Sequence, residues 1–159
     1  MDRRDVMRKV LLVVDLQPEF KDSDGVYEKI LEFVKSQEKD GTYATIVGII
    51  CGNKDNSSFV KYTGWRKLIG GGKQIEYNPD VEINKIGYGL TNYDNLSKSY
   101  HYDIVGFNTD ACVLKVALDL FDRGYDFSVL SKYCYCRRGK ERHSNGLAML
   151  RYLVGDAVI

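Results

Sequence analysis

Residues 101–124 of the chain read HYDIVGFNTDACVLKVALDLFDRG. The apolar run 104–107 predicts a short strand, and the polar residues 108–110 that follow it predict a tight turn. Apolar residues then recur at helical spacing from Val113 to Leu120, and Gly124 is placed to end a helix as its C-cap. This segment therefore predicts the order strand, turn, helix, with Cys112 in the first turn of the helix.

Cys112 is the candidate nucleophile of this segment. A thiol reacts as the thiolate, and a helix N-terminus supplies partial positive charge and unpaired backbone N–H groups that favour the ionised form. We therefore expect Cys112 to ionise readily. The segment alone leaves the alternative open that Cys112 is an inert, buried residue of the apolar helix face.

Apolar runs alternate with amphipathic segments along the rest of the chain. Strands are expected at 9–15, 42–51, 80–85, 104–107, 125–130 and 156–159, and helices at 26–37, 91–99, 112–123 and 139–153. This alternation predicts a three-layer α/β/α fold with a six-stranded, mainly parallel sheet of the Rossmann-like type. Residues 1–159 contain no linker or repeat and are expected to form a single domain.

Composition argues against several classes of partner. The formal net charge is +1 over 159 residues, and no basic stripe suggests binding to nucleic acid or to an anionic membrane. The one basic cluster, Arg137, Arg138, Lys140 and Arg142, is expected to be the solvated start of a helix. The apolar run 10–14 is too short for a signal core or a membrane span, so we expect a cytoplasmic protein.

Cysteine and histidine usage predicts neither a disulfide framework nor a structural zinc site. The four cysteines are few for a chain of this size, and the two histidines lie far apart in the sequence. The glycines at 70–72 are not followed by Lys-Ser or Lys-Thr, so they do not form a phosphate loop. No cofactor is therefore expected.

Three chemically complementary residues are expected to meet at one edge of the sheet. Asp15 and Lys85 end two predicted strands, and Cys112 follows a third. Because the carboxyl ends of parallel strands share one edge, the carboxylate could take the thiol proton while the ammonium stabilises the resulting charges. Each residue alone is more often structural. A phosphoaspartate role for Asp15 is disfavoured because Gln17 fills the position of the second acid.

Three segments resemble the isochorismatase-like cysteine hydrolases, which include the nicotinamidases. They are LLVVDLQPEF at 11–20, INKIGYG at 83–89 and VGFNTDACV at 105–113, and the last is the most specific. The resemblance extends to Val158 and so covers nearly the whole chain. It implies the isochorismatase-like hydrolase fold.

The resemblance also implies roles for individual residues. Asp15, Lys85 and Cys112 would be the catalytic triad. The peptide bond between Phe107 and Asn108 would be cis, and the backbone N–H groups of Asn108 and Cys112 would form an oxyanion hole. Three aromatic residues would line the substrate pocket: Phe20, Tyr88 and Phe107.

The sequence departs from the nicotinamidase pattern where that pattern binds metal. Nicotinamidases of this family hold a metal through an Asp and two His after the second strand. Residues 51–59 here read CGNKDNSSF, with no histidine. This departure from the family pattern argues against a metal site of that type and against nicotinamide as the substrate.

The hypothesis that follows is a metal-independent hydrolase that cleaves the C–N bond of a small amide through a Cys112 thioester. One alternative is an isochorismatase-type vinyl-ether hydrolase that uses Asp15 as an acid. Another is a binding protein that keeps the fold without turnover. Family members commonly form dimers or tetramers, so the resemblance also implies a homo-oligomer that acts on a small-molecule substrate.

Overall fold

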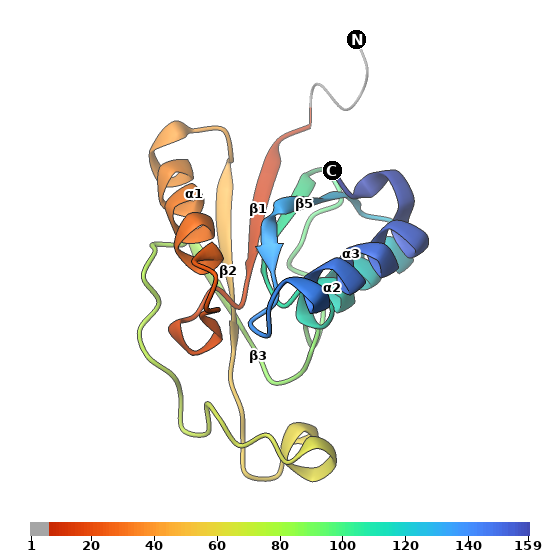
Figure 1. The fold of residues 1–159 in the computed structure, drawn as a ribbon. Helices are drawn as coiled ribbons and strands as arrows, with labels where there is room; N and C mark the ends of the chain where they lie inside the picture. The colour runs from red at the N-terminus through yellow and green to blue at the C-terminus, as the bar shows by residue number, and fades with distance from the viewer. Residues whose placement is uncertain (1–6) are drawn as a thin grey trace.

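A parallel five-stranded sheet forms the centre of the protein in a computed structural model that describes residues 7–159 (Figure 1). Residues 1–6 of the expected domain lie outside that range. The strand order is β3-β2-β1-β4-β5. The strands are β1 (Lys9–Val14), β2 (Thr45–Cys51), β3 (Val81–Lys85), β4 (His101–Phe107) and β5 (Asp126–Tyr135). The helices are α1 (Val26–Asp40), α2 (Cys112–Asp122) and α3 (Lys140–Val154), with short helical turns η2 (Pro18–Phe20), η3 (Phe59–Thr63) and η4 (Gly155–Ala157).

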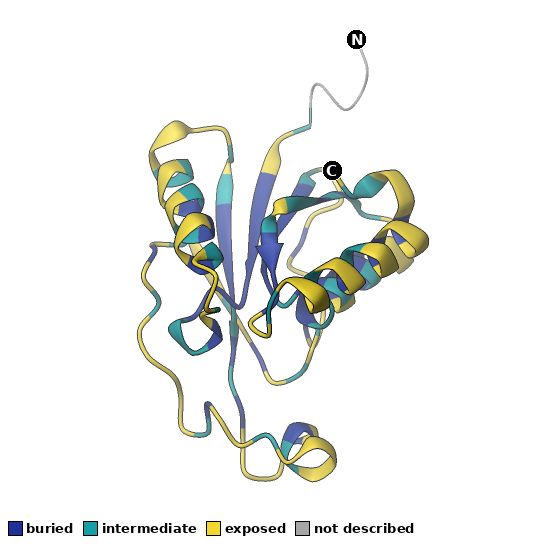
Figure 2. Cartoon of the chain, viewed as in Figure 1, coloured by how far each residue is buried: buried dark blue, intermediate teal, exposed yellow. Residues whose placement is uncertain are grey.

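The helices cover both faces of the sheet, which confirms the three-layer α/β/α prediction. Helix α1 lies on one side, and α2 and α3 lie together on the other (Figure 1). Strands β1, β2 and β4 are almost entirely buried, whereas the edge strand β3 is largely exposed (Figure 2). On β1, Leu12 and Val14 pack with residues of α2, while Leu11 and Val13 pack with residues of α1. Burial on both faces explains why β1 is a continuous apolar run.

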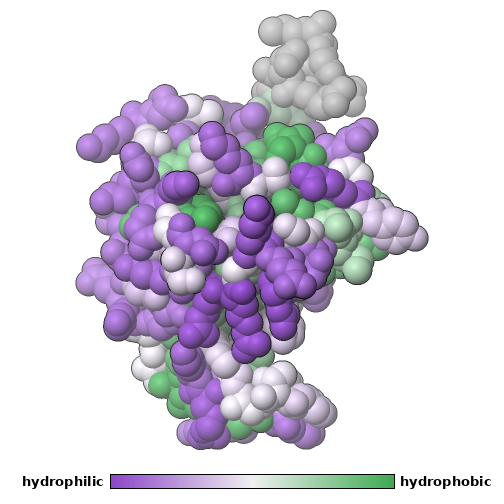
Figure 3. Space-filling model, viewed as in Figure 1, coloured by the Kyte–Doolittle hydropathy of each residue, from purple (hydrophilic) through white to green (hydrophobic). Residues whose placement is uncertain are grey.

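The surface carries mainly hydrophilic residues on the face shown in Figure 3. Apolar residues reach the surface at the lower end of that view. This end contains part of the excursion between β2 and β3, residues 52–80. Within residues 7–159, no helix combines the length and the apolar character that a membrane crossing requires.

The sheet has five strands instead of the expected six. Residues 156–159 form only an isolated bridge, between Val129 and Val158. The turn η4 occupies Gly155–Ala157, so too few residues remain for a strand. The backbone N–H of Ile159 nevertheless donates to the Val129 carbonyl oxygen at 2.9 Å, which keeps this end of the chain beside β5.

The helix expected at 91–99 is also wrong, because this segment consists of bends and turns. Tertiary contacts set its conformation. The Tyr125 hydroxyl donates to the backbone oxygens of Tyr93 (2.9 Å) and Leu96 (2.8 Å), and the side chains of Tyr93 and Leu96 are buried. The backbone thus follows its anchoring side chains instead of a helical repeat.

Strand β5 runs to Tyr135, five residues beyond the expected end at 130. Its pairing with β4 shifts register between Ile104 and Gly106 and then resumes, with Gly106 opposite Cys134 and Phe107 opposite Tyr135. After this irregularity, β5 stays paired with β4 to the carboxyl ends of both strands. The extension carries residues 136–138 to the carboxyl edge of the sheet.

The carboxyl ends of β1 and β4 meet at the point where the strand order reverses. From β1 the chain proceeds to β2 and β3 on one side, then returns to β4 on the other. Open parallel sheets bind ligands in the crevice at such a switch point. The residues after Val14 and Phe107 are therefore placed at the expected binding edge.

Gly106 allows β4 to approach β1 closely at this edge. Its φ is +123°, a region that favours glycine, and a Cβ atom built there would lie 2.0 Å from the Val14 carbonyl oxygen. The clash is with backbone, which cannot rotate away as a side chain can.

We expect Gly106→Ala to lower the free energy of unfolding by about 3 kcal/mol or more, because it combines backbone strain with overpacking. Urea denaturation would measure the change. Gly52→Ala is the matched control at the end of β2, since its Cβ would meet only the Lys85 carbonyl oxygen, at 3.8 Å. Equal stability of the two variants would contradict this account of Gly106.

Candidate active site

The structure brings Asp15, Lys85 and Cys112 together at the carboxyl edge of the sheet. The Lys85 Nζ donates to Asp15 Oδ2 at 3.0 Å and to the Gly87 carbonyl oxygen at 2.8 Å, and it lies 3.3 Å from Cys112 Sγ. Asp15 and Lys85 are each 1% exposed, and Cys112 is 6% exposed. An acid, a cation and a thiol are therefore in contact in a site largely closed to bulk water.

The loop after β1 fixes Asp15. Its φ is +50°, and its N–H donates to the Ile49 carbonyl oxygen at 3.0 Å. Gln17, which is buried, then clamps the loop to the end of β2. The Gln17 amide donates to the Cys51 carbonyl oxygen at 3.0 Å and accepts from the Cys51 N–H at 2.8 Å. From the sequence, Gln17 belonged to the segment 11–20 that resembles the family and argued against a phosphoaspartate role for Asp15. Its clamp on β2 could not be predicted, because that clamp depends on a neighbour distant in the sequence.

The turn before α2 fixes Cys112. The peptide bond between Phe107 and Asn108 is cis, as the resemblance implies. Thr109 Oγ1 lies 2.8 Å from His143 Nδ1 on α3. Gly146, also on α3, touches the turn, since a Cβ there would be 2.8 Å from the Asp110 nitrogen. Helix α3 therefore supports the turn from outside.

Burial controls the protonation of the three groups. It raises the pKa of Asp15, although the Lys85 ammonium opposes the shift. It also raises the pKa of Cys112 well above that of a free thiol, and the negative charge of Asp15 adds to this effect. For Lys85, burial alone would lower the pKa, but Asp15 and Cys112 outweigh it and the pKa is raised.

The expectation that Cys112 ionises readily is therefore wrong for the site without a bound substrate. Its position at the start of α2 is as predicted, but burial and the neighbouring carboxylate dominate. The raised pKa of Cys112 favours the thiol form in the resting site, where Lys85 Nζ lies 3.0 Å from Asp15 Oδ2. Asp15 Oδ1 is buried without a hydrogen-bond partner among the described residues, which leaves it able to accept a proton.

Asn108 and Cys112, whose backbone N–H groups are the expected oxyanion hole, both line the pocket that contains the thiol. The N–H groups of Asn108 and Cys112 donate to no acceptor within residues 7–159, whereas those of Ala111 and Val113 both donate to the Asn108 carbonyl oxygen. Donors that lack a partner next to a nucleophile are the components of an oxyanion hole.

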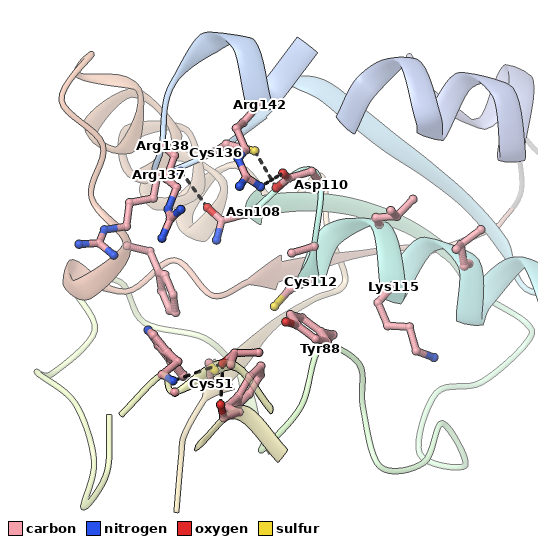
Figure 4. Close-up of a pocket in the computed structure, with 18 residues that line it drawn as sticks. Cys51, Tyr88, Asn108, Asp110, Cys112, Lys115, Cys136, Arg137, Arg138 and Arg142 are labelled. Carbon is pink, nitrogen blue, oxygen red and sulfur yellow. Dashed lines mark hydrogen bonds and ion pairs between the residues drawn. The ribbon is translucent and has the colours of Figure 1, made fainter. Parts of the chain in front are cut away.

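A pocket of about 860 Å³ opens onto Cys112 (Figure 4). Phe20 and Tyr88 line it, at the positions expected from the sequence. The expectation that Phe107 lines the pocket is wrong. Phe107 is fully buried on the α1 face of the sheet, where its ring centre lies 6.0 Å from that of Tyr27.

Aromatic residues from the excursion between β2 and β3 complete one wall. Trp65 stacks on Phe20 at 6.3 Å between ring centres, and Phe59 packs edge-on against Trp65 (5.1 Å) and Tyr88 (5.0 Å). The sequence interpretation missed Phe59 and Trp65, because they lie in a segment without strand or helix periodicity. The only sign in the sequence that this segment could line a pocket was that it contains aromatic residues.

The start of α3 supplies another wall. Arg137, Arg138 and Arg142 line the pocket, whereas Lys140 does not. The interpretation of this cluster as a solvated helix start is therefore incomplete. The three guanidinium groups lie on the Asn108 side of Cys112, and Tyr88 and Cys51 lie on the other side (Figure 4).

The segment 51–59 does not fit a nicotinamidase-type metal. Asn53 uses its amide to hold the excursion: Nδ2 donates to the Trp65 and Lys67 carbonyl oxygens (3.0 and 2.9 Å), and Oδ1 accepts from the Lys54 N–H (2.9 Å) and the Ser57 hydroxyl (2.5 Å). Across the described part of the chain, no group of three His, Cys, Asp or Glu side chains is arranged to hold a metal ion. We assign no catalytic step to a metal.

Solved structures share this fold. A pyrazinamidase/nicotinamidase from Streptococcus mutans UA159 aligns with a TM-score of 0.74 at 19% identity, covering 95% of this chain and 99% of the other. An isochorismatase-like hydrolase from Alkaliphilus metalliredigens has the same TM-score and identity and covers 91% of each chain. An N-carbamoylsarcosine amidase from Thermoplasma acidophilum aligns with a TM-score of 0.70 at 19% identity, covering 96% of this chain and 95% of the other.

No curated protein sequence matches the chain significantly. A family model, by contrast, that of the isochorismatase domain, matches residues 9–158. That range includes all five strands, all three helices and every residue of the triad. The chain therefore belongs to the isochorismatase family of hydrolases.

Proposed function

We propose that the protein hydrolyses the C–N bond of a small amide through a thioester on Cys112, without a metal. One observation supports this above all: Lys85 Nζ contacts both Asp15 Oδ2 (3.0 Å) and Cys112 Sγ (3.3 Å) where the pocket meets the sheet. The amidases among the structural neighbours agree with this choice, although at 19% identity they indicate the fold alone.

Acylation begins with proton transfer from Cys112 to Asp15. The sulfur attacks the amide carbon, and the N–H groups of Asn108 and Cys112 stabilise the oxyanion. Protonated Asp15 then donates its proton to the leaving nitrogen, the C–N bond breaks, and ammonia or an amine departs. Lys85 remains protonated and stabilises negative charge as it moves between carboxylate and sulfur.

Deacylation uses the same base. Asp15 takes a proton from water, and the hydroxide attacks the thioester carbon. The C–S bond breaks, and the proton held by Asp15 restores the Cys112 thiol. The products are a carboxylic acid and ammonia or an amine, and the site returns to its resting protonation.

The vinyl-ether alternative has one observation in its favour. Burial raises the pKa of Asp15, which suits a carboxyl group that donates a proton. Vinyl-ether hydrolysis needs no sulfur nucleophile, so the effect of replacing Cys112 distinguishes it from amide hydrolysis. The homo-oligomeric state and the cytoplasmic location expected from the sequence stay predictions.

Cys112→Ala should abolish ammonia release from a panel of small amides that includes nicotinamide. We expect a loss of at least about 1000-fold, because Cys112 is the pocket thiol that lies 3.3 Å from Lys85 Nζ and, in this mechanism, the one that forms the thioester. Cys134→Ala, which removes a thiol outside the pocket, should retain activity. Added zinc should change neither result. Undiminished turnover by folded Cys112→Ala would favour the vinyl-ether type of reaction, and no turnover by any variant would favour a binding protein.

Asp15→Asn should make Cys112 more reactive while abolishing turnover. The Asp15 charge raises the pKa of the thiol, so its removal leaves Lys85 to stabilise the thiolate. Alkylation by iodoacetamide at pH 7, located by mass spectrometry, should accelerate by about tenfold for each unit by which the pKa falls. Lys85→Met should slow it. Slower labelling in Asp15→Asn than in wild type would refute this electrostatic account.

Amide hydrolysis should decline in acid at a higher pH than an ordinary aspartate predicts. Asp15 must be ionised to act as base, and burial raises its pKa, so the acid limb of kcat/KM should have a midpoint above about 4. Because the pKa of Lys85 is raised as well, its deprotonation should cause no loss below about pH 10. An acid midpoint at or below that of a free aspartate would show that Asp15 is not the base.

A further inference from the structure

Two arginines in the pocket have no acidic partner. Within residues 7–159, no carboxylate pairs with Arg137 or Arg138, and both side chains are exposed at the pocket wall. Unpaired guanidinium groups on the wall of a pocket that Cys112 also lines can bind an anion, because they can donate to a carboxylate in a bidentate manner.

The acidic groups nearby are engaged elsewhere. Asp110 accepts from Arg142 Nη1 at 3.2 Å and from Cys136 Sγ at 3.1 Å (Figure 4). Asp24, which lies near Gly139, accepts from the Tyr135 hydroxyl at 2.6 Å. Helix α3 begins at this point, with no side-chain cap, so its free N–H groups add to the positive potential. The Glu141 carboxylate in its first turn offsets part of that potential.

The arginine segment is tied to the reacting centre. The Arg137 N–H donates to Asn108 Oδ1 at 2.8 Å, and Asn108 lines the same pocket as Cys112. The segment also continues directly from β5, which pairs with β4 up to Phe107 and Tyr135. The backbone that carries Arg137 and Arg138 is therefore held to the turn that precedes Cys112.

The opposite wall is aromatic. Tyr88 lies on the far side of Cys112 from the arginines, and Phe59 packs against it (Figure 4). Phe20 and Trp65 also line the cavity. A cavity of about 860 Å³ holds a ligand larger than a simple amide group. Its lining suits a molecule with an apolar body and a negative charge.

We propose that the substrate is a small amide that also carries a carboxylate, and that Arg137 and Arg138 bind this carboxylate while the amide reaches Cys112. The identity of the reacting group rests on the proposed function above. The anion site does not depend on it, so the two can be tested apart.

Binding without turnover tests the anion site. Calorimetry on Cys112→Ala would compare 4-carbamoylbenzoate with its neutral isostere terephthalamide, and succinamate with succinamide. We expect at least one anionic amide to bind about tenfold or more tightly than its neutral partner, with the difference shrinking as salt is added. Equal binding within both pairs, or no binding of either anion at millimolar concentration, would overturn the proposal.

Substitutions then locate the site. Arg137→Gln and Arg138→Gln, alone and combined, should remove the preference and leave affinity for the neutral amides within about twofold. Lys140→Gln is the matched control, because it removes one charge from the same segment outside the pocket lining. A preference that survives the double substitution, or one lost equally in Lys140→Gln, would overturn the assignment.

Ammonia release by the wild-type protein separates this proposal from the proposed function. Release from an anionic amide, with KM raised about tenfold or more by Arg137→Gln or Arg138→Gln and kcat little changed, supports both. Selective anion binding without ammonia release supports the anion site and refutes amide hydrolysis. Release from neutral amides alone, unaffected by either substitution, refutes the anion site and leaves amide hydrolysis supported.

Discussion

The Lys85 ammonium is buried between a carboxylate and a thiol, and the site depends on this placement. A buried charge costs several kcal/mol in lost hydration unless its partners compensate. Here Asp15 Oδ2, the Gly87 carbonyl oxygen and Cys112 Sγ surround Nζ within 3.3 Å. Because these partners come from three separate segments, the same ion pair that would serve catalysis also fixes how the ends of the strands meet.

That placement also explains why the thiol is not ionised at rest. A helix N-terminus favours a thiolate, but its effect is small compared with full burial next to a carboxylate. Burial raises the pKa of both Cys112 and Asp15, so a proton can pass between two buried groups that both lie beside Lys85 Nζ. A thiol that becomes a thiolate only when it can pass on its proton is protected from unproductive reactions with other electrophiles.

The sequence by itself determined the layers of the fold and the chemical identity of the site. Strands β1 and β4 were predictable because strands buried on both faces must be apolar throughout, and α2 because its apolar residues recur at helical spacing. Asp15, Lys85 and Cys112 were predictable because the carboxyl ends of parallel strands share an edge. Local pattern and one topological rule sufficed for these features.

Only the tertiary structure decided the features that depend on contacts between distant segments. The conformation of 91–99 follows from the Tyr125 hydroxyl, and the length of β5 from its register with β4. The protonation of Cys112 follows from burial. The arginines at 137 and 138 reach the pocket because β5 extends to Tyr135 and Asn108 accepts the N–H of Arg137. None of these features can be predicted from a local sequence pattern. Each depends on an interaction between residues that are far apart in the sequence and come close only in the folded chain.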